Sequence, residues 1–111
     1  MSLLSELKDI LDALNVPVET GVFSDPAPDR YVVLTPLTDT YELFADNRPQ
    51  QSVDEVRIVL FDKDNYRQIK KQIEDELLAR DITVTERRYV TFDSETGYHQ
   101  YAIDVAQNYS L

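Results

Sequence analysis

The sequence contains no cysteine, one histidine and two glycines, and each scarcity excludes a kind of site. Without cysteine the chain can form neither a disulfide nor a thiolate metal site or nucleophile. The two glycines, Gly21 and Gly97, form no cluster between a strand and a helix, so a glycine-rich phosphate-binding loop is excluded. The single histidine, His99, specifies no catalytic geometry by itself, and a strand position with one wet face explains it better.

Long apolar runs and an excess of positive charge are also missing. No window approaches the roughly 18 consecutive apolar residues that a membrane span requires. The opening MSLLSELKDILDALN alternates acids with leucines, so we expect neither a standard export signal nor a membrane partner. Eleven bases against 21 acids give a formal charge of -10, which disfavours binding to nucleic-acid phosphates and anionic membranes.

What the sequence does contain is enough for one hydrophobic core. The 111 residues are 42% hydrophobic and 29% charged, which is typical of a globular protein. We therefore expect residues 1–111 to form a single domain.

Local patterns predict the order of the elements. Ser2 is expected to cap a helix with a stripe of leucines and isoleucine, which ends at Asn15 and Pro17. A second helix is expected at 63–80, with Asp62 or Asp64 as its cap. The expected strands are 30–37, 40–46, 53–61, 81–93 and 98–109, with loops at 24–29, 47–52 and 94–97.

These elements predict an α+β fold. The order is helix, three or four strands, helix and two strands, which favours a mostly antiparallel sheet of four to six strands with both helices on one face. Pro36 cannot donate a ladder hydrogen bond, so its strand either ends there or lies on an edge of the sheet. The β-branched run 53–61 is typical of a central strand.

The acidic residues indicate no metal site. Asp62 and Asp64 begin a segment that resembles a calcium loop, but Arg67 replaces the required glycine and Ile73 the required glutamate. Other carboxylates, which could in principle hold Mg²⁺, are not brought together by any pattern; they are Asp39, Glu42, Asp46, Asp93 and Glu95. We therefore predict no enzyme, no cofactor and no metal.

The seven tyrosines point towards a protein surface instead. Alternation along the last strand places Tyr101, Ile103 and Val105 on the core side, together with His99, and leaves Tyr98 facing outward. Tyr89 is expected opposite Tyr98 across the 94–97 turn. The two rings are either a cross-strand pair that stabilises the hairpin or part of a contact between subunits.

The order of elements and two segments resemble a known family. The segments are YELFADNRPQQSVDEVRIVLFDKDNYRQIKKQIEDELLARDITV and ERRYVTFDSETGYHQYAIDV. They are similar to small neck proteins of long-tailed bacteriophages and prophages, specifically the tail-terminator (tail-completion) class.

The resemblance implies a structural protein of the virion neck, assembled in the cytoplasm of the bacterial host, without catalysis. Its subunits would form a ring, expected to be a hexamer, that caps the tail tube protein and joins head-completion or connector proteins, while DNA passes through the lumen without specific binding. A ring needs two different complementary patches on each subunit. The candidate interface residues are Tyr89, Tyr98, Tyr41, Phe44, Glu95 and Arg87.

The charge leaves one alternative open: an acidic protein that mimics DNA and inhibits a host nucleic-acid enzyme. A mimic needs a continuous track of carboxylates, whereas here the acids are interleaved with bases such as Lys8, Arg57 and Arg88. The interleaving favours the ring.

Overall fold

A computed structural model describes residues 2–21, 27–45 and 48–110, with the side chains of 39–45 and 49–51 excepted. Across these residues the order of elements is α1 (Leu3–Ala13), β1 (Val18–Thr20), β2 (Arg30–Ala45), β3 (Arg48–Asp62), α2 (Tyr66–Ala79), β4 (Thr83–Phe92) and β5 (His99–Ser110).

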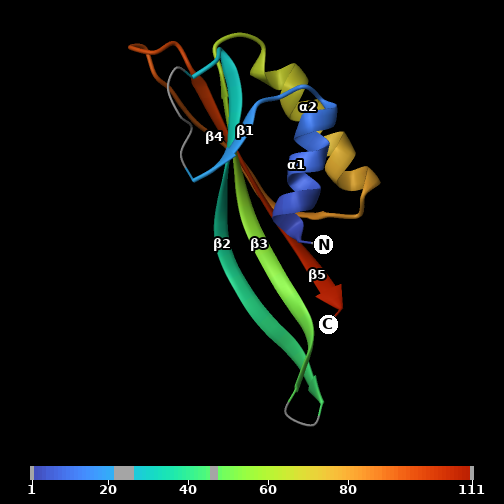
Figure 1. Cartoon of the computed structure of the whole chain (residues 1–111). Coiled ribbons are helices and arrows are strands. Elements are labelled where there is room, and N and C mark those ends of the chain that lie inside the picture. The colour runs from blue at the N-terminus through green and yellow to red at the C-terminus, as the bar shows by residue number, and fades with distance from the viewer. Residues whose placement is uncertain (1, 22–26, 46–47, 111) are drawn as a thin grey trace.

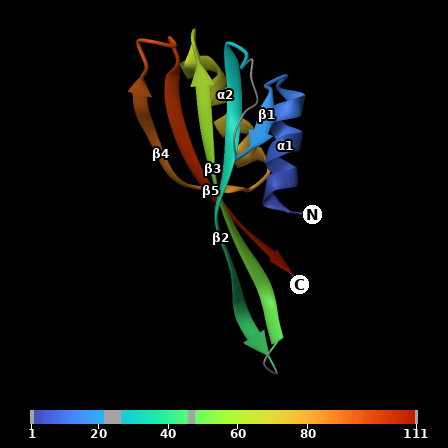
Figure 2. The same ribbon diagram turned by 60° about the vertical axis from the view of Figure 1, so that its left-hand side comes forward.

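The strands form one sheet with the order β1-β2-β3-β5-β4 (Figure 2). β1 runs parallel to β2, and each of the other neighbouring pairs is antiparallel. Both helices lie on the same side of the sheet (Figure 1). The predicted α+β fold, its order of elements and the central position of β3 are therefore confirmed.

Helix α1 forms as its sequence predicts. The Ser2 side chain accepts a hydrogen bond from the Ser5 backbone N–H, and Ser5 Oγ accepts one from the Ser2 N–H, so both ends of a capping box are present. The helix ends before Asn15, which has a φ of 59° and so takes the left-handed conformation that stops helices.

Helix α2 begins later than predicted, and its cap is a different residue. The Asn65 side chain accepts the Gln68 N–H and caps the helix, so the prediction of Asp62 or Asp64 is wrong. Asp62 instead belongs to β3, where its two oxygens accept hydrogen bonds from Arg30 Nε at 2.7 Å and from the Asp64 N–H at 2.8 Å. Because Asp62 is paired with Arg30 and lies three residues before the N-cap Asn65, its carboxylate does not cap α2.

The core lies between the helices and the facing side of the sheet. Apolar residues at helical spacing meet alternate residues of the three central strands, and each such side chain stabilises the fold by about 1.5–3 kcal/mol. The main contributors are Leu3, Leu7, Ile10 and Leu11 of α1, Ile69, Ile73 and Leu77 of α2, Val32 and Leu34 of β2, Val56, Ile58 and Leu60 of β3, and Tyr101, Ile103 and Val105 of β5. The predicted core face of β5 is confirmed for these last three residues.

The hairpin of β2 and β3 is longer than the sequence predicts. Pro36 does not end its strand: β1 pairs with Val32–Leu34, and β2 continues past Pro36 along the edge of the sheet after a bulge at Leu37. The predicted loop 47–52 is strand from Arg48 onward, because these residues pair with β2 and, from Gln51, with β5. The hairpin extends beyond the helices as a narrow projection (Figure 1), and the molecule measures 55 × 26 × 22 Å.

Candidate subunit interface

The predicted interface residues do not form one patch. Tyr41 and Phe44 lie on the projecting part of β2, but their side chains are outside the described part of the structure. Glu95 is exposed in the β4–β5 turn, where its backbone N–H donates to Asp93. Tyr98, Tyr89 and Arg87 lie in three different settings.

Tyr98 lies on the predicted face of β5, but it is buried, so the expectation that it is exposed to a partner is wrong. Only 9% of Tyr98 is exposed, and its hydroxyl donates to the Pro28 carbonyl at 2.6 Å. The ring stands edge-on to Tyr31 and Phe61, with centroids 5.4 and 6.1 Å away. It does lie on the sheet face away from the helices, but neighbouring aromatic rings cover it there.

Tyr89 does not face Tyr98, because the hairpin pairs Phe92 with His99 and so places Tyr89 further along β5, opposite Tyr101. A bulge between Tyr89 and Thr91 shifts the register by one residue at this point, and a second bulge lies between Val84 and Glu86. Tyr89 therefore points to the helix side of the sheet. It remains 44% exposed, so it stays a candidate for contact with a partner.

Arg87 is directed towards α2. Its Nη1 lies 2.6 Å from Glu74 Oε2. The hydrogen bond and the charge of Glu74 raise the pKa of Arg87 above its ordinary value, so the guanidinium remains cationic. The pair ties β4 to the helix and leaves the guanidinium half exposed.

Strand β4 forms one edge of the sheet and exposes apolar side chains at its end. We call residues 83–92 the β4 edge. Val90, which follows Tyr89, is 46% exposed, and Phe92 is 49% exposed. The middle of the strand carries Glu86, Arg87 and Arg88 between the two bulges. Charges and bulges are the usual means by which a sheet edge avoids indiscriminate pairing, so a strand could be added to β4 only where its shape and charges fit.

An aromatic group supports the exposed end of the β4 edge. Tyr89 Oη and His99 Nδ1 lie 3.0 Å apart and share a hydrogen bond. The His99 ring also packs against Phe92, with centroids 4.7 Å apart, and against Tyr66 of α2 at 5.1 Å. Sequence reasoning missed this group, because it depends on the bulges of β4. The group holds Tyr89 and Phe92 in place while they remain exposed.

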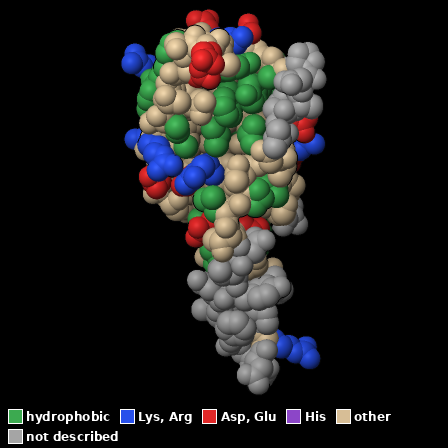
Figure 3. All heavy atoms as spheres, turned by 90° about the vertical axis from the view of Figure 1, so that its left-hand side faces the viewer, with side chains coloured by type: hydrophobic (Ala, Val, Ile, Leu, Met, Phe, Trp, Pro, Cys, Tyr) green, Lys and Arg blue, Asp and Glu red, His purple; other side chains and the backbone are tan. Residues whose placement is uncertain are grey.

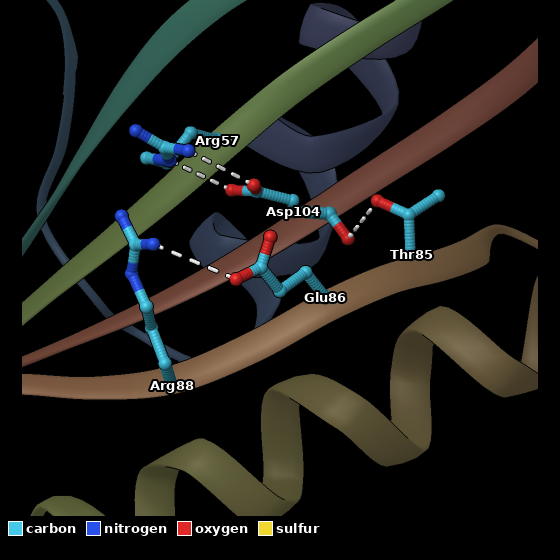
Figure 4. Close-up of polar contacts among 5 residues, drawn as sticks. All are labelled: Arg57, Thr85, Glu86, Arg88 and Asp104. Atoms are coloured by element: carbon cyan, nitrogen blue, oxygen red, sulfur yellow. Dashed lines mark hydrogen bonds and ion pairs between the residues drawn. The ribbon is translucent and has the colours of Figure 1, made fainter.

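The open face of the sheet combines apolar and paired charged residues. Figure 3 shows hydrophobic side chains across the middle of this face, with charged ones gathered beside them. Arg57 of β3 and Asp104 of β5 form two hydrogen bonds, of 2.8 and 3.0 Å (Figure 4). Arg88 and Glu86 of β4 form a looser pair at 3.5 Å. Asp104 and Glu86 on this face are thus paired with neighbouring bases.

The projecting hairpin is the second exposed surface, and we call residues 35–55 the arm. β5 accompanies β3 as far as the pair Gln51–Ser110. Beyond the pair Glu42–Gln51, the described arm consists of β2 and β3 alone, over residues 43–45 and 48–50. A ribbon of two strands is at best marginally stable in water, so this short tip adds little stability of its own.

The opposite edge of the sheet is short and grooved. β1 contributes three residues, and an open groove of about 390 Å³ lies between it and α1. Leu4, Val18 and Leu34 supply the apolar lining, and Lys8 and Glu19 are charged. This edge differs from the β4 edge in length, charge and shape.

The described residues contain no group of three or more metal-ligating side chains close enough to hold an ion. Within that same part of the chain, neither helix is long and apolar enough to span a bilayer.

In comparisons with known proteins, no protein-family model matches the chain and no curated protein matches its sequence.

Proposed function

We propose that this protein is a ring-forming structural subunit of a phage head–tail joint, of the tail-terminator type. The arm carries the proposal. On its outer side, β2 has no described neighbour from residue 35 to residue 45, and beyond the pair of Gln51 with Ser110 the arm is a ribbon of β2 and β3 alone (Figure 1). A second copy that contacts the arm would satisfy the backbone groups on that outer side.

Two further features support closure into a ring. The sheet ends in two unlike edges, one formed by β1 and the other by β4. A contact between unlike surfaces is head-to-tail, and it closes into a ring when the rotation per subunit divides a full turn. In such a ring a net charge of -10 would let DNA pass through the lumen without adhering.

The proposed partners are therefore other copies of this chain, the tail tube protein below the ring and a head-completion or connector protein above it. Six subunits is the number that the family resemblance implies. The protein would act in the virion neck after assembly in the host cytoplasm, with no catalytic step.

Mass measurement and electron microscopy test the proposal. The purified protein, alone and with tail tubes from the same phage or prophage, should form closed rings of one size and should stop tube growth. A protein that stays monomeric at high concentration and neither binds nor caps the tubes would contradict the proposal. If that monomer competed with DNA for a nucleic-acid enzyme, the result would favour the acidic DNA mimic.

A further inference from the structure

The arm has a free strand edge of defined length. β3 pairs with one side of β2, and β1 pairs with the other side at Val32–Leu34; on that second side no described strand lies beside residues 35–45. This leaves a row of backbone N–H and C=O groups along the outer side of the arm. Such a row is a template for one more strand.

The β4 edge offers a second free edge of similar length. β4 has ten residues, and among the described strands it pairs with β5 alone. By contrast, β1 at the far end of the sheet has three residues. A strand added to β1 would form few hydrogen bonds, whereas β4 and the free part of β2 are similar in length. The two bulges of β4 limit regular pairing to the stretches on either side of them.

Charge also favours contact between the arm and β4. Residues 35–55 hold five acids and one base, a net charge of 1 - 5 = -4. Residues 63–92, which include α2 and β4, hold seven bases and six acids, a net charge of 7 - 6 = +1. In a chain of net charge -10 this segment is the exception, so it is the surface on which an acidic arm meets least repulsion.

Apolar contact adds to this match. Leu37 stands out at the bulge near the root of the arm and is 41% exposed. Tyr89, Val90 and Phe92 are exposed at the end of β4. If the two edges pair, Leu37 of one copy and Tyr89, Val90 and Phe92 of the next would lie on one continuous sheet.

We propose that the outer edge of the arm in one copy pairs with β4 of the next copy, so that the sheet continues from subunit to subunit. This inference rests on the proposed function and deepens it, since it assigns the two patches of the head-to-tail contact. Each subunit gives its arm to one neighbour and its β4 edge to the other. The free outer side of β2 thereby gains a neighbouring strand.

The absence of cysteine allows a direct test by disulfide cross-linking. Within one subunit β2 and β4 are separated by β3 and β5, so their backbones are about 14 Å apart at strand spacing. A disulfide requires Cα atoms within about 7 Å. Any disulfide between the arm and β4 must therefore join two copies.

One chain carries Leu37→Cys, and a second carries a cysteine at each exposed β4 position in turn, from Thr83 to Phe92. The scan covers the registers in which Leu37 lies opposite β4. After mixing and mild oxidation, we expect a covalent dimer at one or more β4 positions. A chain with both cysteines should give a ladder of covalent oligomers that ends at the ring size.

Controls separate this inference from the proposed function. Thr20→Cys on β1 is the matched variant for the other edge of the sheet, and each single-cysteine chain alone should remain uncross-linked. If rings form but β4 cysteines cross-link to Thr20→Cys and not to Leu37→Cys, the arm pairing is wrong and the ring stands. If the cysteine-free chain forms no assembly, alone or with tail tubes, both are wrong.

Discussion

At the scale of single residues, the side chains that hold the described structure together are those whose partners lie far away in the sequence. Asp62 binds Arg30, Tyr98 binds Pro28, and Tyr109 binds Glu6, so strand ends and loops are tied to distant segments. Sequence patterns indicate none of these pairs, because a local pattern does not specify which distant groups meet.

Replacing Asp62 with alanine should lower the free energy of unfolding by about 2–3 kcal/mol, because the buried carboxylate accepts hydrogen bonds from a guanidinium and a backbone N–H. Urea denaturation measures the change. Glu86→Ala is the control, since Glu86 forms an exposed pair with Arg88 and its loss should cost under about 1 kcal/mol. Equal losses in the two variants would contradict the role given to Asp62.

Tyr109 should make stability fall at high pH. Burial, together with the hydrogen bond and charge of Glu6, raises the pKa of Tyr109 above its ordinary value of 10.0. The phenol therefore ionises earlier in the unfolded chain than in the folded one, and its contribution is complete below about pH 10 and lost as the pH rises above that value.

Tyr109→Phe keeps the ring and removes the titrating group. Urea unfolding between about pH 8 and pH 11 should show a shallower decline for the variant than for the parent, and the other tyrosines act equally in both. Parallel declines would show that Tyr109 does not titrate differently in the two states.

At the scale of elements, the sequence predicts best those helices and strands whose formation depends on neighbouring residues in the chain. α1 was predicted closely because its cap and its apolar stripe lie within its own turns. The arm was underestimated because Pro36 and the polar run from residue 47 are local turn signals that strand pairing overrides. The position of Tyr89 was predicted wrongly, because the regular alternation of side chains along a strand fails at a bulge, and one lies between Tyr89 and Thr91.

Shortening the arm should separate folding from assembly. Removing residues 42–51 and joining Tyr41 to Ser52 by an Asn-Gly turn leaves the core residues and both helices in place. We expect a melting temperature within a few degrees of the parent, because each kcal/mol shifts it by roughly 4–8 °C and no buried apolar contact of the core is lost.

Ring formation, by contrast, should be lost in the shortened chain. Asp9→Ala, on the exposed side of α1, is the control and should change neither property. Normal rings from the shortened chain would show that assembly does not use this part of the arm.

At the scale of the whole molecule, the two helices and the sheet that they cover form a compact body, and the arm projects from it. The radius of gyration of the Cα atoms is 15.2 Å, whereas a compact domain of this length is expected near 13 Å. The excess comes from the arm, which projects beyond the helix layer (Figure 1). A subunit of this shape offers a large contact area for its mass.

Small-angle scattering of the dilute subunit should detect this shape. We expect an elongated particle, and we expect the arm-shortened chain to fall towards about 13 Å, apart from a hydration layer common to both. Equal radii for the two chains would mean that the arm folds back on the body in solution.

The bond between Tyr109 and Glu6 places the last strand against the first helix. Ser110 pairs with Gln51, so the C-terminal end of the described chain lies along the arm, whereas Ser2 lies near Pro36 at its root. In the proposed assembly, a purification handle fused at the N-terminal end would occupy space that an incoming neighbour needs beside β2. Assembly assays on such a fusion would then understate how readily the subunits associate.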